Sequence, residues 1–224
     1  CGITAQACAG YSLGELSAIV YSKILDIQDG FRLVIQRAQA MQKCADQNQG
    51  SMAAVIGQDF DTVEKLCQKA GLYPVNYNCP GQITIAGDAQ KIDEFIKSMQ
   101  EQGIRVIKLA VNGAFHSPHM DNAAQVIKGY LELLKFNDPI IDIYSNVTGQ
   151  KYSKPYADLI YNQINSPVRW QTIIQNMIQD GVNIFIEIGA GKTLSNFIKK
   201  INNSVQVYNV QDQSSLKAVT NALS

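Results

Sequence analysis

The sequence predicts an α/β fold in which a small domain interrupts a larger one. Helical and strand patterns alternate over residues 1–49 and again over residues 112–224, which favours one larger α/β domain made from both segments. Residues 184–188 form a strongly apolar run of the kind found in the buried strands of parallel sheets. Between the two segments, residues 50–111 follow the order β-α-β-β-α-β, which is the ferredoxin-like unit.

The small domain is predicted from its turn residues and apolar spacing. One helix, over residues 60–70, ends at Gly71, and another, over residues 92–102, is followed by Gly103. The second helix carries four apolar residues on one face, at positions 92, 95, 96 and 99. Strands are expected at residues 52–56, 73–77, 82–86 and 104–111.

The larger domain is predicted from the same patterns on both sides of residues 50–111. Helices are expected at residues 12–20, 31–45, 118–134, 171–179 and 193–201 and near Leu216, and strands at residues 140–144, 184–188 and 205–210. Residues 1–9 are small and uncharged and are expected to form a buried strand. Because a domain of this class rarely begins with its central strand, an N-terminal segment is expected to be missing.

Composition and charge disfavour several classes of partner. The chain has 224 residues, 46% of them hydrophobic, which is enough for a large core and a small inserted domain. The 19 basic and 19 acidic residues balance, so the protein has no long-range attraction for nucleic acid or anionic lipid. No apolar run approaches the ~20 residues of a membrane helix. We therefore expect neither nucleic acid nor a membrane as partner.

The cysteines and histidines give no sign of a metal site. The five cysteines, Cys1, Cys8, Cys44, Cys67 and Cys79, contain no C-x-x-C pair, and the only two histidines lie three residues apart. An odd number of unpatterned cysteines is typical of reduced thiols in a cytoplasmic protein. We expect no bound metal.

The run Gly10-Tyr11-Ser12-Leu13-Gly14 fits the pattern G-x-S-x-G. In this pattern a sharp turn between a strand and a helix exposes the serine as a nucleophile. The backbone N–H of Leu13 would then face a developing oxyanion. The alternative is an ordinary strand-to-helix turn in which Ser12 caps the helix.

His116 is the candidate base for this serine. Ser117 can cap a helix that begins with Pro118, so His116 would precede a helix N-terminus, where the helix dipole disfavours the charged imidazolium. The alternatives are a histidine of the capping loop for His116 and a surface position for His119. No histidine follows His119, and the chain order therefore does not fit an ordinary esterase triad.

Arg37 is unusual among the four arginines. The residues three and four positions away on the predicted helix are Leu33, Val34, Ala40 and Met41, all of them apolar. A guanidinium on such a face needs an anionic partner, and its planar fork suits a carboxylate. The alternative is an arginine at the edge of the apolar face whose charged end reaches solvent.

Seven short motifs, in order over nearly the whole chain, resemble those of one known family. They are AGYSLGE at residues 9–15, QRAQAMQ at 36–42, NCPGQ at 78–82, FHS at 115–117, SNVTG at 145–149, SPVRW at 166–170 and EIGAG at 187–191. The chain resembles the malonyl-CoA:acyl-carrier-protein transacylases and the acyltransferase domains of polyketide synthesis. The resemblance implies an α/β-hydrolase-like domain, residues 1–49 and 112–224, with a ferredoxin-like insert at residues 50–111.

The resemblance also implies a role for individual residues. Ser12 would take the acyl group and His116 would be its base. Arg37 would hold the malonyl carboxylate, and the main-chain carbonyl of Gln163 would orient the histidine in place of a triad acid. The Leu13 N–H would bind the oxyanion.

Two further positions are implied as substrate-binding. They are Asn78, in the NCPGQ motif, and Phe115, whose Ala-Phe-His-Ser run resembles the malonyl-selective version of the family rather than the methylmalonyl version. The chain departs from the family at its start, because the family's first strand and Gly-Gln-Gly motif, which supplies a second oxyanion donor, are not present. With this donor missing, the chain as it stands is expected to transfer the acyl group more slowly than it would with the Gly-Gln-Gly segment restored.

The implied reaction moves a malonyl group from malonyl-CoA to the phosphopantetheine thiol of acyl carrier protein, in fatty acid or polyketide synthesis. It needs no cofactor beyond the coenzyme A thioester, and the expected location is the cytoplasm. Two alternatives stay open. One is a serine hydrolase or thioesterase of acyl-CoA, and the other is an inactive fragment that binds carrier protein.

Overall fold

The computed structural model describes residues 2–223, and Cys1 therefore lies outside the described residues. In chain order the elements are β1 (Ala7–Ala9), α1 (Leu13–Tyr21), α2 (Ile27–Gln47), β2 (Gly50–Ile56), α3 (Phe60–Ala70), β3 (Tyr73–Cys79), β4 (Gln82–Asp88), α4 (Ala89–Glu101), β5 (Arg105–Lys108), the 3-10 helix η1 (Pro118–Met120), α5 (Asp121–Leu131), β6 (Asp142–Tyr144), α6 (Tyr156–Asn165), α7 (Trp170–Gln179), β7 (Ile184–Ile188), α8 (Thr193–Ile201), β8 (Gln206–Val210) and α9 (Gln213–Leu223).

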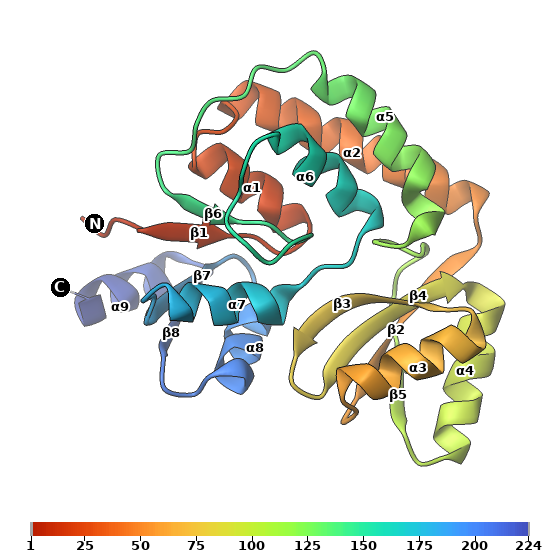
Figure 1. The fold of residues 1–224 in the computed structure, drawn as a ribbon. Coiled ribbons are helices and arrows are strands. Elements are labelled where there is room, and N and C mark those ends of the chain that lie inside the picture. The colour runs from red at the N-terminus through yellow and green to blue at the C-terminus, as the bar shows by residue number, and fades with distance from the viewer. Residues whose placement is uncertain (1, 224) are drawn as a thin grey trace.

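The segment from β2 to β5 forms an antiparallel sheet with two helices against it (Figure 1). The strand order is β3-β4-β2-β5, and the predicted order of six elements is confirmed. Buried residues of α3 and α4, among them Val63, Ile92 and Phe95, pack with Val55 and Ile83 of the sheet in one apolar cluster. The predicted last strand is shorter than expected, because only residues 105–108 pair with β2.

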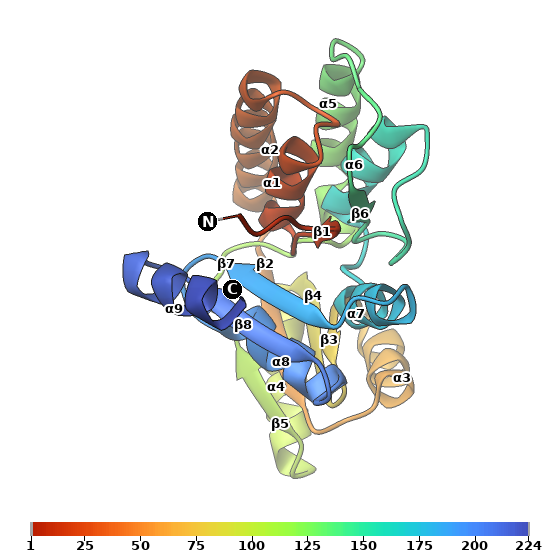
Figure 2. The ribbon, with the colours of Figure 1, turned by 90° about the vertical axis from the view of Figure 1, so that its left-hand side faces the viewer.

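The remaining strands form two separate parallel pairs, β1 with β6 and β7 with β8. Figure 2 shows β1 and β7 in neighbouring layers of the molecule, but within residues 2–223 no strand pairs with both. The strand at residues 184–188 is confirmed, but its predicted burial is wrong except at Phe185: Ile184 is 41% exposed, Ile188 is 83% exposed, and residues 186–187 are half-buried. Residues 7–9 of β1 are likewise half-buried rather than buried.

Helices α1, α2, α5 and α6 pack around the β1–β6 pair and bury a second apolar cluster (Figure 1). Helix α2 begins four residues before the predicted start at residue 31. Asp26 caps the helix there, because its side chain accepts a hydrogen bond from the Asp29 N–H. The single helix expected at residues 118–134 is instead η1 followed by α5. Helix α6 was not predicted, although its buried residues Tyr156, Ile160, Gln163 and Ile164 follow helical spacing.

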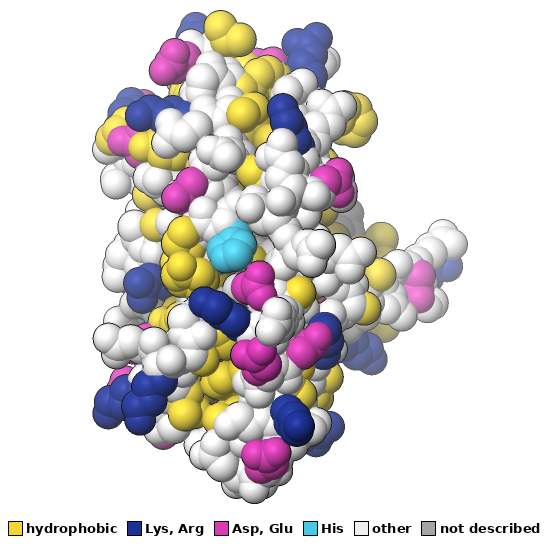
Figure 3. Space-filling model, turned by 90° about the vertical axis from the view of Figure 1, so that its right-hand side faces the viewer, with side chains coloured by type: hydrophobic (Ala, Val, Ile, Leu, Met, Phe, Trp, Pro, Cys, Tyr) yellow, Lys and Arg dark blue, Asp and Glu magenta, His cyan; other side chains and the backbone are white. Residues whose placement is uncertain are grey.

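The face of the molecule in Figure 3 agrees with the balanced composition. On the face in Figure 3, basic and acidic side chains are interspersed with polar and apolar ones.

None of the helices in residues 2–223 combines the length and apolarity needed to cross a membrane. Within the same residues, no three His, Cys, Asp or Glu side chains come together as metal ligands, and Cys8, Cys44, Cys67 and Cys79 are free thiols.

Candidate active site

Ser12 lies in the tight turn from β1 into α1. Its backbone has φ 50° and ψ −105°, a conformation that non-glycine residues rarely adopt. Gly10 is required here, because a Cβ on it would meet the carbonyl carbon of Gly14 at 2.0 Å. Gly14 itself has open space where a side chain would be, so packing requires only the first motif glycine. The Ser12 side chain makes no capping bond to α1, which contradicts the helix-cap alternative.

His116 is in hydrogen-bond contact with this serine. Its Nε2 lies 2.7 Å from Ser12 Oγ, and its Nδ1 lies 2.8 Å from the main-chain oxygen of Gln163. Because a carbonyl oxygen only accepts, Nδ1 carries the hydrogen and Nε2 is free to accept the Ser12 proton. Burial, and then the charge of Arg37, lower the pKa of His116 to about 4. The expected neutral base thus has a cause other than the helix dipole.

Arg37 reaches the same point from α2. Its Nη2 donates to Ser12 Oγ at 3.1 Å and to Gln163 Oε1 at 3.0 Å. The residue is only 7% exposed, so the alternative of an arginine that reaches solvent is wrong. Burial lowers the Arg37 pKa to about 10, and the nearby charge of Glu15 acts in the opposite direction.

The Arg37 guanidinium is incompletely satisfied. Within residues 2–223 its Nε has no hydrogen-bond partner, and no carboxylate forms an ion pair with it. A buried cation with a free donor is suited to receive an anion, because burial removes the competing water.

A cavity of about 410 Å³ opens over these groups. It is lined by Tyr11, Ser12, Arg37, Ala38, Met41, Gln42, Met52, Asn76, Thr84, Leu109, Val111, Phe115 and His116. Its walls come from the turn between β1 and α1, from α2, from the four-stranded sheet and from the segment between β5 and η1. The nucleophile, base and cation therefore share one pocket with apolar walls, as expected of a small-molecule site.

The two remaining substrate-binding candidates are placed differently. Phe115 lines the cavity, whereas Asn78 does not. Asn78 is 2% exposed, its Oδ1 accepts from the Tyr11 hydroxyl at 2.6 Å, and its Nδ2 donates to Thr84 Oγ1 at 3.1 Å. Asn78 can act on the cavity only through the two lining residues that it holds.

Leu13, the oxyanion candidate, begins α1 with a 54% exposed side chain. Within the described part of the chain its N–H has no hydrogen-bond acceptor. The neighbouring N–H of Ser12 is occupied, since it donates to Asn146 Oδ1 at 2.8 Å. Leu13 is therefore the residue beside Oγ with a free backbone donor.

Three polar groups of the site were missed from sequence. They are Asn146, Glu15 and the side chain of Gln163, whose Nε2 donates to the Ser12 carbonyl at 2.6 Å. Burial raises the pKa of Glu15 to about 7, although hydrogen bonds from the Tyr152 hydroxyl and the Asn146 N–H act in the opposite direction. The available signal for Glu15 is that it is the only charged residue of the apolar helix α1.

Comparisons with known proteins show the family of the chain. The acyl transferase domain family matches residues 1–220. The malonyl CoA-acyl carrier protein transacylase of Staphylococcus aureus (strain MSSA476) is 36% identical over 216 residues, which cover 93% of this chain and 70% of that protein. The enzyme of the same name from Bacillus subtilis (strain 168) is 35% identical over 231 residues, covering 99% and 73%.

Solved structures give the same result. The malonyl CoA-acyl carrier protein transacylase of Clostridium perfringens has a TM-score of 0.95 at 35% identity, covering 99% of this chain and 72% of that one. A malonyl-transacylase solved in complex with its type II polyketide-synthase acyl-carrier protein has a TM-score of 0.94 at 29% identity, covering 99% and 74%. The chain therefore belongs to the acyl transferase domain family.

Proposed function

We propose that this chain transfers a malonyl group from malonyl-CoA to the phosphopantetheine thiol of an acyl carrier protein, in fatty acid or polyketide synthesis. One observation carries the proposal: Ser12 Oγ contacts both the His116 ring at 2.7 Å and the buried Arg37 guanidinium at 3.1 Å. A hydrolase of neutral esters has no use for a buried cation beside its nucleophile. The named relatives, which are malonyl CoA-acyl carrier protein transacylases, support the same substrate.

The reaction runs in two steps. Ser12 Oγ attacks the thioester carbonyl while His116 Nε2 takes its proton, the Leu13 N–H binds the oxyanion, and coenzyme A leaves with that proton. The carrier thiol then attacks the acyl-serine as His116 Nε2 takes the thiol proton; the new thioester forms, the acyl–Oγ bond breaks, and His116 returns the proton to Ser12 Oγ. Arg37 pairs with the malonyl carboxylate, and the Gln163 carbonyl holds the His116 ring. Ser12 and His116 account for every bond and proton moved, so the balance needs no added metal or redox group.

The fold supports a finer assignment as well. We assign residues 50–111 to a ferredoxin-like small domain, on the element order and the strand order β3-β4-β2-β5. Residues 1–49 and 112–224 then form an α/β-hydrolase-like domain that carries the nucleophile, the cation and the base. The free thiols of the described cysteines favour the cytoplasm as its location.

Intact-mass spectrometry after incubation with malonyl-CoA tests the proposal. The expected result is one malonyl adduct on Ser12, which disappears when holo carrier protein is added and reappears on the carrier. Ser12→Ala is the matched control and should give no adduct. Release of free malonate without transfer to the carrier would favour a hydrolase, and no adduct at all would favour an inactive carrier-binding fragment.

A further inference from the structure

The backbone of Ser12 is held from both sides by buried side chains. Its φ of 50° is disfavoured for a non-glycine residue and persists only where the surroundings fix it. The Ser12 N–H donates to Asn146 Oδ1 at 2.8 Å, and the Ser12 carbonyl accepts from Gln163 Nε2 at 2.6 Å. Gln163 also contacts His116 and Arg37, whereas Asn146 contacts no other group of the reaction and has no role yet.

Asn146 joins the two sides of the turn that carries Ser12. Its side chain accepts from the Ser12 N–H and donates through Nδ2 to the Gly10 carbonyl at 2.6 Å. Its own N–H donates to Glu15 Oε1 at 3.0 Å, and its carbonyl accepts from the Arg169 N–H at 2.9 Å. Asn146 is 0% exposed, so its side-chain and main-chain polar groups are committed inside the protein.

Glu15 fixes Asn146 from the first turn of α1. It is 1% exposed, and its Oε1 also accepts from the Tyr152 hydroxyl at 2.6 Å. A buried carboxyl group in an apolar helix is costly unless its hydrogen bonds compensate. Here those bonds tie the helix after Ser12 to the loop that follows β6, which brings Asn146 under the turn.

The turn angle set by this contact controls two reacting groups together. A rotation of the Ser12 backbone would move Oγ away from His116 and would also turn the Leu13 N–H. A displacement of about 1 Å in such groups can cost ~10² in rate. Because the Ser12 N–H is bound to Asn146, it cannot compensate as an oxyanion donor.

We propose that Asn146, anchored by Glu15, is a positioning residue that holds the Ser12 turn in its reactive geometry. The proposal rests on the proposed function, because it assumes that acyl-Ser12 is the intermediate. It concerns the rate of acylation rather than the binding of the acyl donor, since Asn146 does not line the cavity.

The first test compares Asn146→Leu with the parent protein in single-turnover acylation by malonyl-CoA. The expected result is a maximal rate lower by ~10², while the malonyl-CoA concentration at half-maximal rate stays within about threefold. Ile92→Val is the matched control, because Ile92 is fully buried in the small sheet's core and its shortening lowers the melting temperature without touching Ser12. Acylation by Asn146→Leu at the parent rate would overturn the proposal, as would a loss equal to that of Ile92→Val.

Asn146→Asp decides the matter where Asn146→Leu fails to fold. A protonated carboxyl group offers one acceptor and one donor, which are the two roles that the Asn146 amide fills here. The acylation rate of Asn146→Asp, divided by that of the parent, should therefore rise as the pH falls from about 8 to about 5. The titratable or charged groups around this position are Glu15, Tyr152, Arg169 and, across Ser12, His116 and Arg37. The parent contains all of them, and measuring both proteins at each pH removes the part of their titration that the two proteins share. A ratio independent of pH would overturn the proposal.

Labelling by an alkyl fluorophosphonate separates this proposal from the proposed function. The probe phosphonylates an activated serine and carries no malonyl group. Slower labelling of Ser12 in the Asn146 variants than in the parent supports the positioning role, whatever the result with malonyl-CoA. Failure of malonyl-CoA to acylate the parent would count against the malonyl function alone. Labelling at the parent rate in both variants would overturn the positioning role.

Discussion

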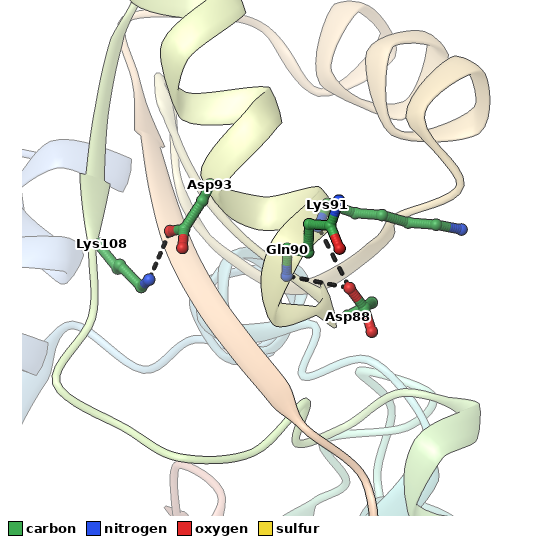
Figure 4. A network of polar contacts seen from close by, with 5 residues as sticks. All are labelled: Asp88, Gln90, Lys91, Asp93 and Lys108. Carbon is green, nitrogen blue, oxygen red and sulfur yellow. Dashed lines mark hydrogen bonds and ion pairs between the residues drawn. The ribbon is translucent and has the colours of Figure 1, made fainter.

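The turn around Ser12 and the polar network of the small sheet use hydrogen bonds in opposite ways. In the small sheet, Asp88 caps α4 by accepting from the Gln90 and Lys91 N–H groups, and Lys108 pairs with Asp93 (Figure 4). These contacts are local or solvent-exposed. Removing one leaves groups that water can satisfy.

Around Ser12 the polar groups are buried and the backbone departs from ordinary conformations. Ser12 and His116 both have positive φ without being glycine, and Arg37 Nε is left without a partner. A protein tolerates such departures where function requires them. The comparison indicates that polar groups near Ser12 serve the reaction, whereas those of the small sheet serve stability.

Among the substitutions near Ser12, His116→Ala should have the largest effect on the rate of acylation. Loss of a positioned base should slow acylation of Ser12 by ~10²–10⁴, because no other described base contacts Ser12 Oγ. Single-turnover mass spectrometry measures the rate, and a thermal melt checks the fold. Acylation at the parent rate would show that His116 is not the base.

Arg37→Ala should change the acyl preference rather than remove the chemistry. Malonyl-CoA should lose on the order of 10²–10³ in kcat/KM, because its carboxylate loses a charged partner in a desolvated site. Acetyl-CoA should lose little or gain, because it no longer leaves the guanidinium unpaired. Arg37→Lys should restore malonyl transfer only in part, since an ammonium lacks the planar fork. Equal losses for both substrates would contradict the role of Arg37 as the carboxylate partner.

The burial of His116 should also change how kcat/KM depends on pH, and this effect should be smaller than those of the two substitutions above. With the His116 pKa lowered to about 4, the neutral base persists below the ordinary histidine range and is lost only as pH falls through that value. The acid limb of kcat/KM should therefore lie well below pH ~6.5. In Arg37→Ala the limb should move upward, because one cause of the lowering is removed. The same profile measured for Glu15→Gln shows any part of the acid limb that comes from titration of Glu15. An acid limb of kcat/KM near pH ~6.5 in the parent would contradict a buried His116 base.

The sequence was sufficient for those parts of the site that local rules fix. The G-x-S-x-G turn, the Ser117 cap and the apolar surroundings of Arg37 each identified a residue. The structure then brings Ser12, Arg37 and His116 together across 25 and 104 positions of the chain. The order of elements in residues 50–111 was predictable for the same reason, since turns and apolar spacing are local.

The rest depends on tertiary contacts that no local pattern contains. Asn146 and Gln163 meet Ser12 across 134 and 151 positions, and Glu15 meets Asn146 across 131. Periodicity cannot tell which distant groups will meet. The exposure of Ile188 was mispredicted for a related reason, because an apolar run does not say how many neighbours its strand will have.

Lys108→Ala should have the smallest effect, because it removes an exposed contact of the small sheet rather than a buried one near Ser12. The Lys108 and Asp93 side chains are 48% and 58% exposed, so water replaces each partner when the other is lost. Exposed pairs of this kind contribute about 0–1 kcal/mol, and the loss should shrink further at high salt. Acylation of Ser12 should equal the parent rate, because Lys108 does not line the cavity. Denaturant unfolding of Lys108→Ala, Asp93→Ala and the double variant measures the coupling between the two side chains. A coupling well above 1 kcal/mol, or a slowed acylation, would mean that the small sheet's surface network also supports the reaction centre.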